Sequence, residues 1–89
     1  MLSDASLTSL LREWRRCVAY DTNRPARRVL CDRSLQHVVA MRPKSKDELV
    51  FILKAVGLST QTIAKFKLHY AEPILQIIQI ASFDYTKKL

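Results

Sequence analysis

Leu11-Arg12-Glu13-Trp14-Arg15-Arg16 begins the most informative part of this sequence, which continues to Glu48-Leu49. Around this hexapeptide, apolar residues recur at helical spacing: Leu7, Leu10, Leu11, Trp14 and Val18. The spacing predicts an amphipathic helix whose arginines, Arg12, Arg15 and Arg16, fall away from the apolar stripe and face solvent. The helix should end near Tyr20, because Asp21-Thr22-Asn23 and Pro25 favour a loop.

The next segments, up to Pro43, predict one short turn and one further helix. The stretch from Pro25 to Leu30 is too short for more than a single helical turn. Asp32 is predicted to cap the following helix, because its carboxylate can accept otherwise unpaired backbone N–H groups. This helix should bury Leu35, Val38 and Val39 and end before Pro43, which disfavours helical geometry at Arg42.

Two further helical regions follow Pro43. Ser45-Lys46-Asp47-Glu48 has the pattern of a capping box, in which Ser45 accepts from the Glu48 amide and Glu48 reaches back. That helix should end at Gly57, which suits a left-handed cap. The last region starts after Ser59 or Thr60, and Pro73 predicts a kink or break near Tyr70, because in a continuous helix its ring would clash with the preceding turn.

These patterns together predict an all-α protein, a single compact bundle of about five short helices. The chain has 89 residues, enough for one domain. We expect the domain to span residues 1–89, with its core at about 7–78 and a flexible tail at 82–89. We expect a monomer in isolation.

Positive charge is concentrated in one part of the chain. The formal net charge is +7, and residues 12–46 hold ten of the fifteen Lys and Arg residues against three acids. Such a concentration is typical of proteins that bind polyanions, and arginine suits phosphate because its planar fork can donate two hydrogen bonds. The alternative is a solvated charged face that keeps a small domain soluble. The predicted nucleic-acid-binding residues are Arg12, Arg15, Arg16, Arg27, Arg28, Arg33, Lys44 and Lys46.

No pattern of catalysis, metal binding or membrane insertion occurs in the sequence. His37 and His69 lack ligands at metal spacing, and no nucleophile or phosphate-loop motif is present, so we expect no enzyme activity, metal or cofactor. Cys17 and Cys31 are expected to be reduced and mostly buried thiols. The sequence has neither a signal-peptide pattern nor an apolar run long enough for a membrane. The expected location is intracellular, in the nucleus or in the bacterial cytoplasm or nucleoid.

The arrangement from Leu7 to Ile78 resembles the HRDC domain, a small helical module near the C-terminus of RecQ-type helicases and RNase D-type exonucleases. The residues that carry the resemblance recur in the family's order: Trp14 with its flanking arginines, Pro25, Asp32, Leu35, Pro43 and Leu49. The resemblance implies that Trp14, Leu35 and Leu49 lie in the core. It also implies a module without chemistry of its own, which aids substrate engagement by a larger enzyme and binds DNA in some members and protein in others.

Two functions follow as hypotheses. The first is an accessory nucleic-acid-binding domain of a larger helicase or exonuclease, which contacts the backbone of single-stranded or junction DNA or RNA through its arginines. Tyr20 is the candidate for base stacking, because Trp14 falls on the apolar stripe. The second is a protein-docking module, with the catalytic core of the parent enzyme as its expected partner. It rests on the apolar segments Leu49 to Leu53 and Ile74 to Phe83, which are richer than one helix face requires.

Overall fold

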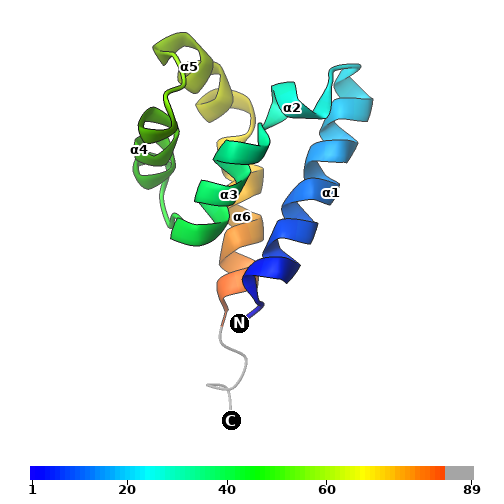
Figure 1. The fold of residues 1–89 in the computed structure, drawn as a ribbon, viewed down its shortest axis with the longest axis vertical. Helices are drawn as coiled ribbons and strands as arrows, with labels where there is room; N and C mark the ends of the chain where they lie inside the picture. The colour runs from blue at the N-terminus through cyan, green and yellow to red at the C-terminus, as the bar shows by residue number, and fades with distance from the viewer. Residues whose placement is uncertain (84–89) are drawn as a thin grey trace.

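The fold is a bundle of α-helices, seen in a computed structural model that describes residues 1–83 (Figure 1). Within these residues the helices are α1 (Asp4–Thr22), α2 (Ala26–Val29), α3 (Asp32–Met41), α4 (Lys46–Val56), α5 (Thr60–His69) and α6 (Ala71–Ser82). The all-α prediction is confirmed, with six helices in place of about five, because α2 is the single turn expected after Pro25 and the last helical region is divided. No helix of this part of the chain is long and apolar enough to span a membrane.

The core lies where α1, α3, α4 and α6 meet. α1 and α6 run side by side in opposite directions, and α3 packs against α1 (Figure 1). The α4–α5 pair lies on the side of α3 and α6 that faces away from α1 (Figure 1). Leu35 and Leu49 are buried in the core as predicted, whereas Trp14 is half-buried and packs against it. Leu10 was expected on the buried stripe of α1 but is exposed. Leu7 and Leu11, one turn apart, fill that face without it.

The capping residues of α3 and α4 differ from the prediction in two details. α3 begins after Cys31, which makes no side-chain capping bond, so the prediction that Asp32 caps the helix is wrong. In α4 the Ser45 hydroxyl accepts from the Glu48 amide at 3.2 Å, as predicted. The Glu48 carboxylate, however, accepts from the Lys44 amide at 2.5 Å, one residue before its expected partner. Gly57 ends α4 at φ 102°, where a glycine is favoured.

The predicted break near Tyr70 separates α5 from α6. α5 ends at His69 and α6 begins at Ala71, so Pro73 lies in the first turn of α6, where its missing N–H would have had no helical partner. The predicted tail begins inside this helix, because Ser82 is the last residue of α6. Residues 84–89, the remainder of that predicted tail, lie outside the described part of the chain.

Candidate functional site

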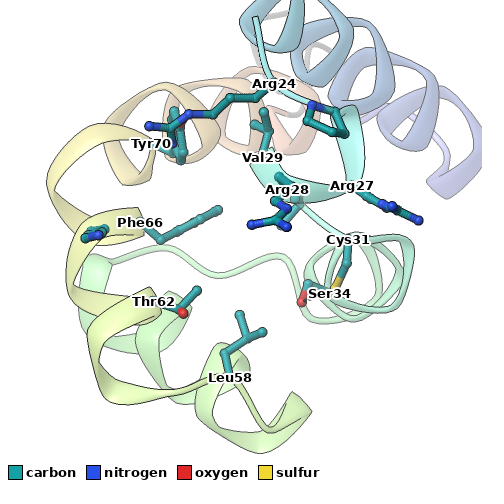
Figure 2. A pocket seen from close by; sticks show the side chains of 13 residues that line it. Arg24, Arg27, Arg28, Val29, Cys31, Ser34, Leu58, Thr62, Phe66 and Tyr70 are labelled. Atoms are coloured by element: carbon teal, nitrogen blue, oxygen red, sulfur yellow. Dashed lines mark hydrogen bonds between the residues drawn. The ribbon is translucent and has the colours of Figure 1, made fainter. Parts of the chain in front are cut away.

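A basic cleft of about 670 Å³ lies between α2 and α5. The cations that line it are Arg24, Arg27, Arg28 and Lys65, and no aspartate or glutamate is among its lining residues. Figure 2 shows Arg28 directed into the space between α2 and α5, and Arg24 extending over it toward Tyr70. Arg27 also borders the cleft but extends along the opposite side of α2 (Figure 2). The cleft therefore presents positive charge from both of its walls.

Aromatic side chains form part of the lining of the cleft. Tyr70 lies there between two aromatic rings, with centroids 5.7 Å from Trp14 and 5.5 Å from Phe66, both edge to face. This geometry is the one that aromatic rings prefer, and it joins α1, α5 and the α5–α6 junction. Ser34 and Thr62 add hydroxyl groups to the walls. Several like charges surround this lining, so a phosphate in the cleft would be attracted by more than one cation at once.

The short helix α2 positions Arg27 and Arg28. Pro25 precedes it with φ −60°, the value that a proline ring imposes, and its carbonyl accepts from the Arg28 amide at 2.9 Å. The turn closes with a hydrogen bond from the Leu30 amide to the Ala26 carbonyl, at 3.2 Å. Consecutive helical residues point about 100° apart. This divergence explains why Arg28 enters the cleft while Arg27 lies beside it.

Arg15, one of the predicted binding residues, is a structural side chain. Its guanidinium donates to the Leu30 carbonyl at 2.8 Å and to the Asp32 carboxylate at 2.7 Å, and the side chain is only 14% exposed. The prediction that Arg15 faces solvent is therefore wrong, because α3 starts close enough to α1 to engage it. The pKa of Asp32 is lowered, first by the hydrogen bond from Arg15 and then by the positive charge of Arg15. The charge of Arg12 lowers this pKa further. Arg15 joins α1 to the start of α3.

The other predicted residues occupy separate places. Arg16 pairs with Glu13 on the exposed side of α1, and this hydrogen bond lowers the pKa of Glu13 and raises that of Arg16. Arg12 and Arg33 are exposed. Lys44 and Lys46 follow the C-terminal end of α3, about 15 Å along that helix from α2, and Lys46 lies 3.6 Å from Glu72. Of the eight predicted residues, only Arg27 and Arg28 line the cleft.

Two cations of the cleft, Arg24 and Lys65, were not among the predicted residues. Arg24 had a usable signal, because it directly precedes Pro25 in the link that also carries Arg27 and Arg28. Lys65 had none, because it belongs to a segment that is neutral overall and reaches the cleft only through the packing of α5. Arg24 and Lys65 make no ion pair within residues 1–83, so their charges are available to a ligand.

The cysteines differ from expectation in their exposure. Both are free thiols, but Cys17 is exposed and Cys31 is half-buried, so the prediction of mostly buried thiols is wrong. Cys17 lies on the outer side of α1, where its sulfur is 4.0 Å from Glu13, and Cys31 lies 3.1 Å from the Ser34 hydroxyl. In the part of the chain that the structure describes, no three His, Cys, Asp or Glu residues group together as metal ligands would.

The comparisons with known proteins give one match. The sequence model of the HRDC domain matches residues 4–78 of the 89 residues, in agreement with the resemblance seen from Leu7 to Ile78. Neither a curated protein nor a solved structure matches the chain.

Proposed function

This chain belongs to the HRDC family of non-catalytic accessory domains of helicases and exonucleases, and we propose that it binds nucleic acid on behalf of such an enzyme. Its ligand would be the sugar–phosphate backbone of single-stranded or junction DNA or RNA. The parent enzyme would be a RecQ-type helicase or an RNase D-type exonuclease. The domain would add affinity for the substrate and leave the chemistry to the parent.

The basic cleft between α2 and α5 is the observation that carries this proposal. Arg24 from the α1–α2 link, Arg28 from α2 and Lys65 from α5 converge on it, and no carboxylate of the lining opposes them. Backbone phosphates carry one negative charge for each nucleotide, so consecutive phosphates of a strand could engage these cations in turn. Arginine can grip two phosphate oxygens at once, whereas lysine acts as a point charge. None of these contacts reads a base edge, so the binding would be largely independent of sequence.

Salt dependence of binding tests the proposal. A fluorescently labelled single-stranded oligonucleotide is titrated with the full chain at several salt concentrations, and the logarithm of the affinity is plotted against the logarithm of salt. Three phosphate contacts predict a slope of roughly −2, from about −0.7 for each contact to a single strand. A slope near zero, or no binding at low salt, would contradict the proposed function. A DNA and an RNA strand of the same length show whether the cleft prefers either backbone.

A second candidate function is protein docking, and one surface favours it. The apolar segment from Leu49 to Leu53 is mostly core, since Leu49, Ile52 and Leu53 are buried, but Phe51 remains 69% exposed. Together with Met41 and Pro43 it lines a separate apolar hollow, at the end of α3 that is remote from α2. Exposed apolar surface of this kind marks protein contacts in other proteins. Two results together would favour this function over the first. The domain would bind the catalytic part of the parent enzyme, with Phe51→Ser abolishing that binding, and it would show no salt-dependent binding of an oligonucleotide.

A further inference from the structure

Tyr20 is an aromatic side chain for which the fold has no packing role. It lies in the last turns of α1 and is 85% exposed, whereas the neighbouring Ala19 is buried. A ring of this size usually buries most of its surface when it stabilises a fold. The contact between Trp14, Phe66 and Tyr70 illustrates that use within the same protein. Tyr20 takes no part in that cluster.

The end of α1 holds Tyr20 next to Arg24. Asn23 adopts a left-handed conformation, φ 54°, and its amide donates to the Tyr20 carbonyl at 3.3 Å. The Arg24 amide donates to the Ala19 carbonyl at 3.0 Å, and together the two bonds form a Schellman motif. This motif turns the chain back beside the helix. Tyr20, Asn23, Arg24 and Pro25 consequently line a common hollow at the surface.

Arg24 connects this hollow to the basic cleft, because it lines both. Its side chain extends over the cleft toward Tyr70 (Figure 2), while its amide donates to the carbonyl of Ala19, the residue before Tyr20. A phosphate bound at Arg24 would therefore have the cleft on one side and the phenol ring of Tyr20 on the other.

The surroundings of the exposed aromatic side chains differ in charge. Among the described residues, Tyr20, Phe51 and Phe83 are the exposed aromatics. Tyr20 shares its hollow with Arg24, whereas the charged residues around the Phe51 hollow are Asp47 and Glu48. Carboxylates repel a nucleic-acid backbone and a cation attracts it. Electrostatics therefore favour Tyr20 over Phe51 as a ring that meets a nucleotide.

We infer that Tyr20 is a base-stacking platform for a nucleotide whose strand leaves the basic cleft past Arg24. The inference rests on the proposed function and narrows it, because a base can stack on a protein ring only where it is not already stacked and paired in a duplex. The ligand is then a single strand or a single-stranded end, with its phosphates on Arg24, Arg28 and Lys65. Stacking on a ring accepts any base, so it adds affinity without sequence preference.

Two ligands and three variants test the inference. One ligand is an oligothymidylate of about ten nucleotides, within the range of sites on single-strand-binding domains. The other is an abasic strand with the same number of phosphates. Tyr20→Ala should weaken binding of the oligothymidylate about tenfold and leave the abasic strand unaffected, because only the first ligand has bases to stack. Tyr20→Phe keeps the ring and should bind both strands like wild type, as should Phe51→Ala.

The outcomes separate the inference from the proposed function. In one outcome, wild type binds the oligothymidylate with the expected salt dependence and Tyr20→Ala binds it equally well. This result would overturn the stacking role of Tyr20 and leave the proposed function of the cleft intact. An equal loss of both ligands in Tyr20→Ala also overturns the platform, because the ring would then act through the backbone contacts. Wild type that binds neither strand overturns the proposed function itself. Circular dichroism and thermal unfolding of Tyr20→Ala should match wild type, since the ring is exposed.

Discussion

The guanidinium of Arg42 donates a hydrogen bond to the backbone carbonyl of Leu2, at 2.6 Å, across 40 positions of the sequence. The same side chain reaches the Asp4 carboxylate at 3.1 Å and the Ala81 carbonyl at 3.4 Å, and it is only 16% exposed. Leu2 itself donates to Ala81 at 2.7 Å. Arg42 thus ties the start of α1 to the end of α6 from the link that follows α3. Arg42 belongs to the basic segment of the sequence, but its hydrogen bonds are all to groups within the fold.

Replacing this arginine should destabilise the domain. Arg42→Ala removes several hydrogen bonds that a charged donor makes to partly buried carbonyls, and we expect a loss of about 2 kcal/mol in the free energy of unfolding. Urea unfolding followed by circular dichroism measures it. Arg33→Ala is the matched control, because Arg33 is exposed and makes no ion pair within residues 1–83, and it should change stability by less than about 0.5 kcal/mol. Equal urea midpoints for the two variants would contradict the structural role of Arg42.

The start of α4 gives a second stability prediction. Ser45 accepts from the Glu48 amide, so Ser45→Ala leaves that amide without its capping partner and should cost about 1 kcal/mol. Ser9→Ala, at an exposed position inside α1, should be neutral or slightly stabilising, since alanine is the better helix former. Chemical denaturation of both variants decides the question. A Ser45→Ala protein as stable as Ser9→Ala would show that the hydroxyl does not cap the helix.

The ion pair between Arg15 and Asp32 predicts a pH-dependent contribution to stability. The Arg15 guanidinium lowers the pKa of Asp32 in the folded state, so the pair stabilises the fold above the unfolded carboxyl pKa of about 3.9. That contribution is lost as the pH falls through the lower, folded pKa. Asp32→Asn should therefore have a lower urea midpoint than wild type at neutral pH, and the difference should shrink in acid. Asp21→Asn, which breaks no described ion pair, should follow wild type at every pH. A gap that is constant with pH would contradict the prediction.

Charge reversal inside the cleft should weaken binding of nucleic acid. Arg28→Glu places a carboxylate where the structure has a cation directed into the cleft, so the affinity for a single strand should fall several-fold and the salt slope should lose about 0.7. Fluorescence anisotropy at several salt concentrations measures both quantities. The thermal midpoint should stay close to that of wild type, because Arg28 is exposed.

Two controls carry the same change of charge elsewhere. Lys54→Glu, on the exposed surface of α4, measures the effect of net charge alone and should weaken binding only slightly. Lys44→Glu tests the wider set of predicted residues at the other end of α3. If Lys44→Glu reduces the affinity and the salt slope as much as Arg28→Glu does, the strand extends beyond the cleft. If Lys54→Glu does the same, the binding reflects net charge and the cleft is not its site.

The helices could be predicted where their signals are local. Ser45, Gly57 and Pro73 act within a few residues of themselves, through capping, a left-handed backbone and a missing N–H, so the limits of α4 and the break before α6 follow from the sequence. The family resemblance also rests on local order along the chain, and the family model agrees with it.

The cleft could not be predicted, because its residues meet only through tertiary packing. Arg24 and Lys65 lie far apart in the sequence, and helical periodicity does not state which helix faces which. For the same reason the periodicity of α1 assigned Arg15 to solvent, although Leu30, after α2, and Asp32, at the start of α3, cover it. Charge in a sequence indicates a kind of ligand, but the pairing of a cation such as Arg15 depends on neighbours 15 or more positions away.

The hydrogen bond between Leu2 and Ala81 also determines how this domain can be carried by a larger protein. It brings both ends of the bundle to one pole, and α1, about 28 Å long, runs from there to the opposite pole, where α2 and α5 lie (Figure 1). A polypeptide joined at either end would therefore be attached at the pole opposite the basic cleft. On the proposed function, a strand bound in the cleft would lie a helix length away from that attachment, which leaves space between the strand and the rest of the larger protein.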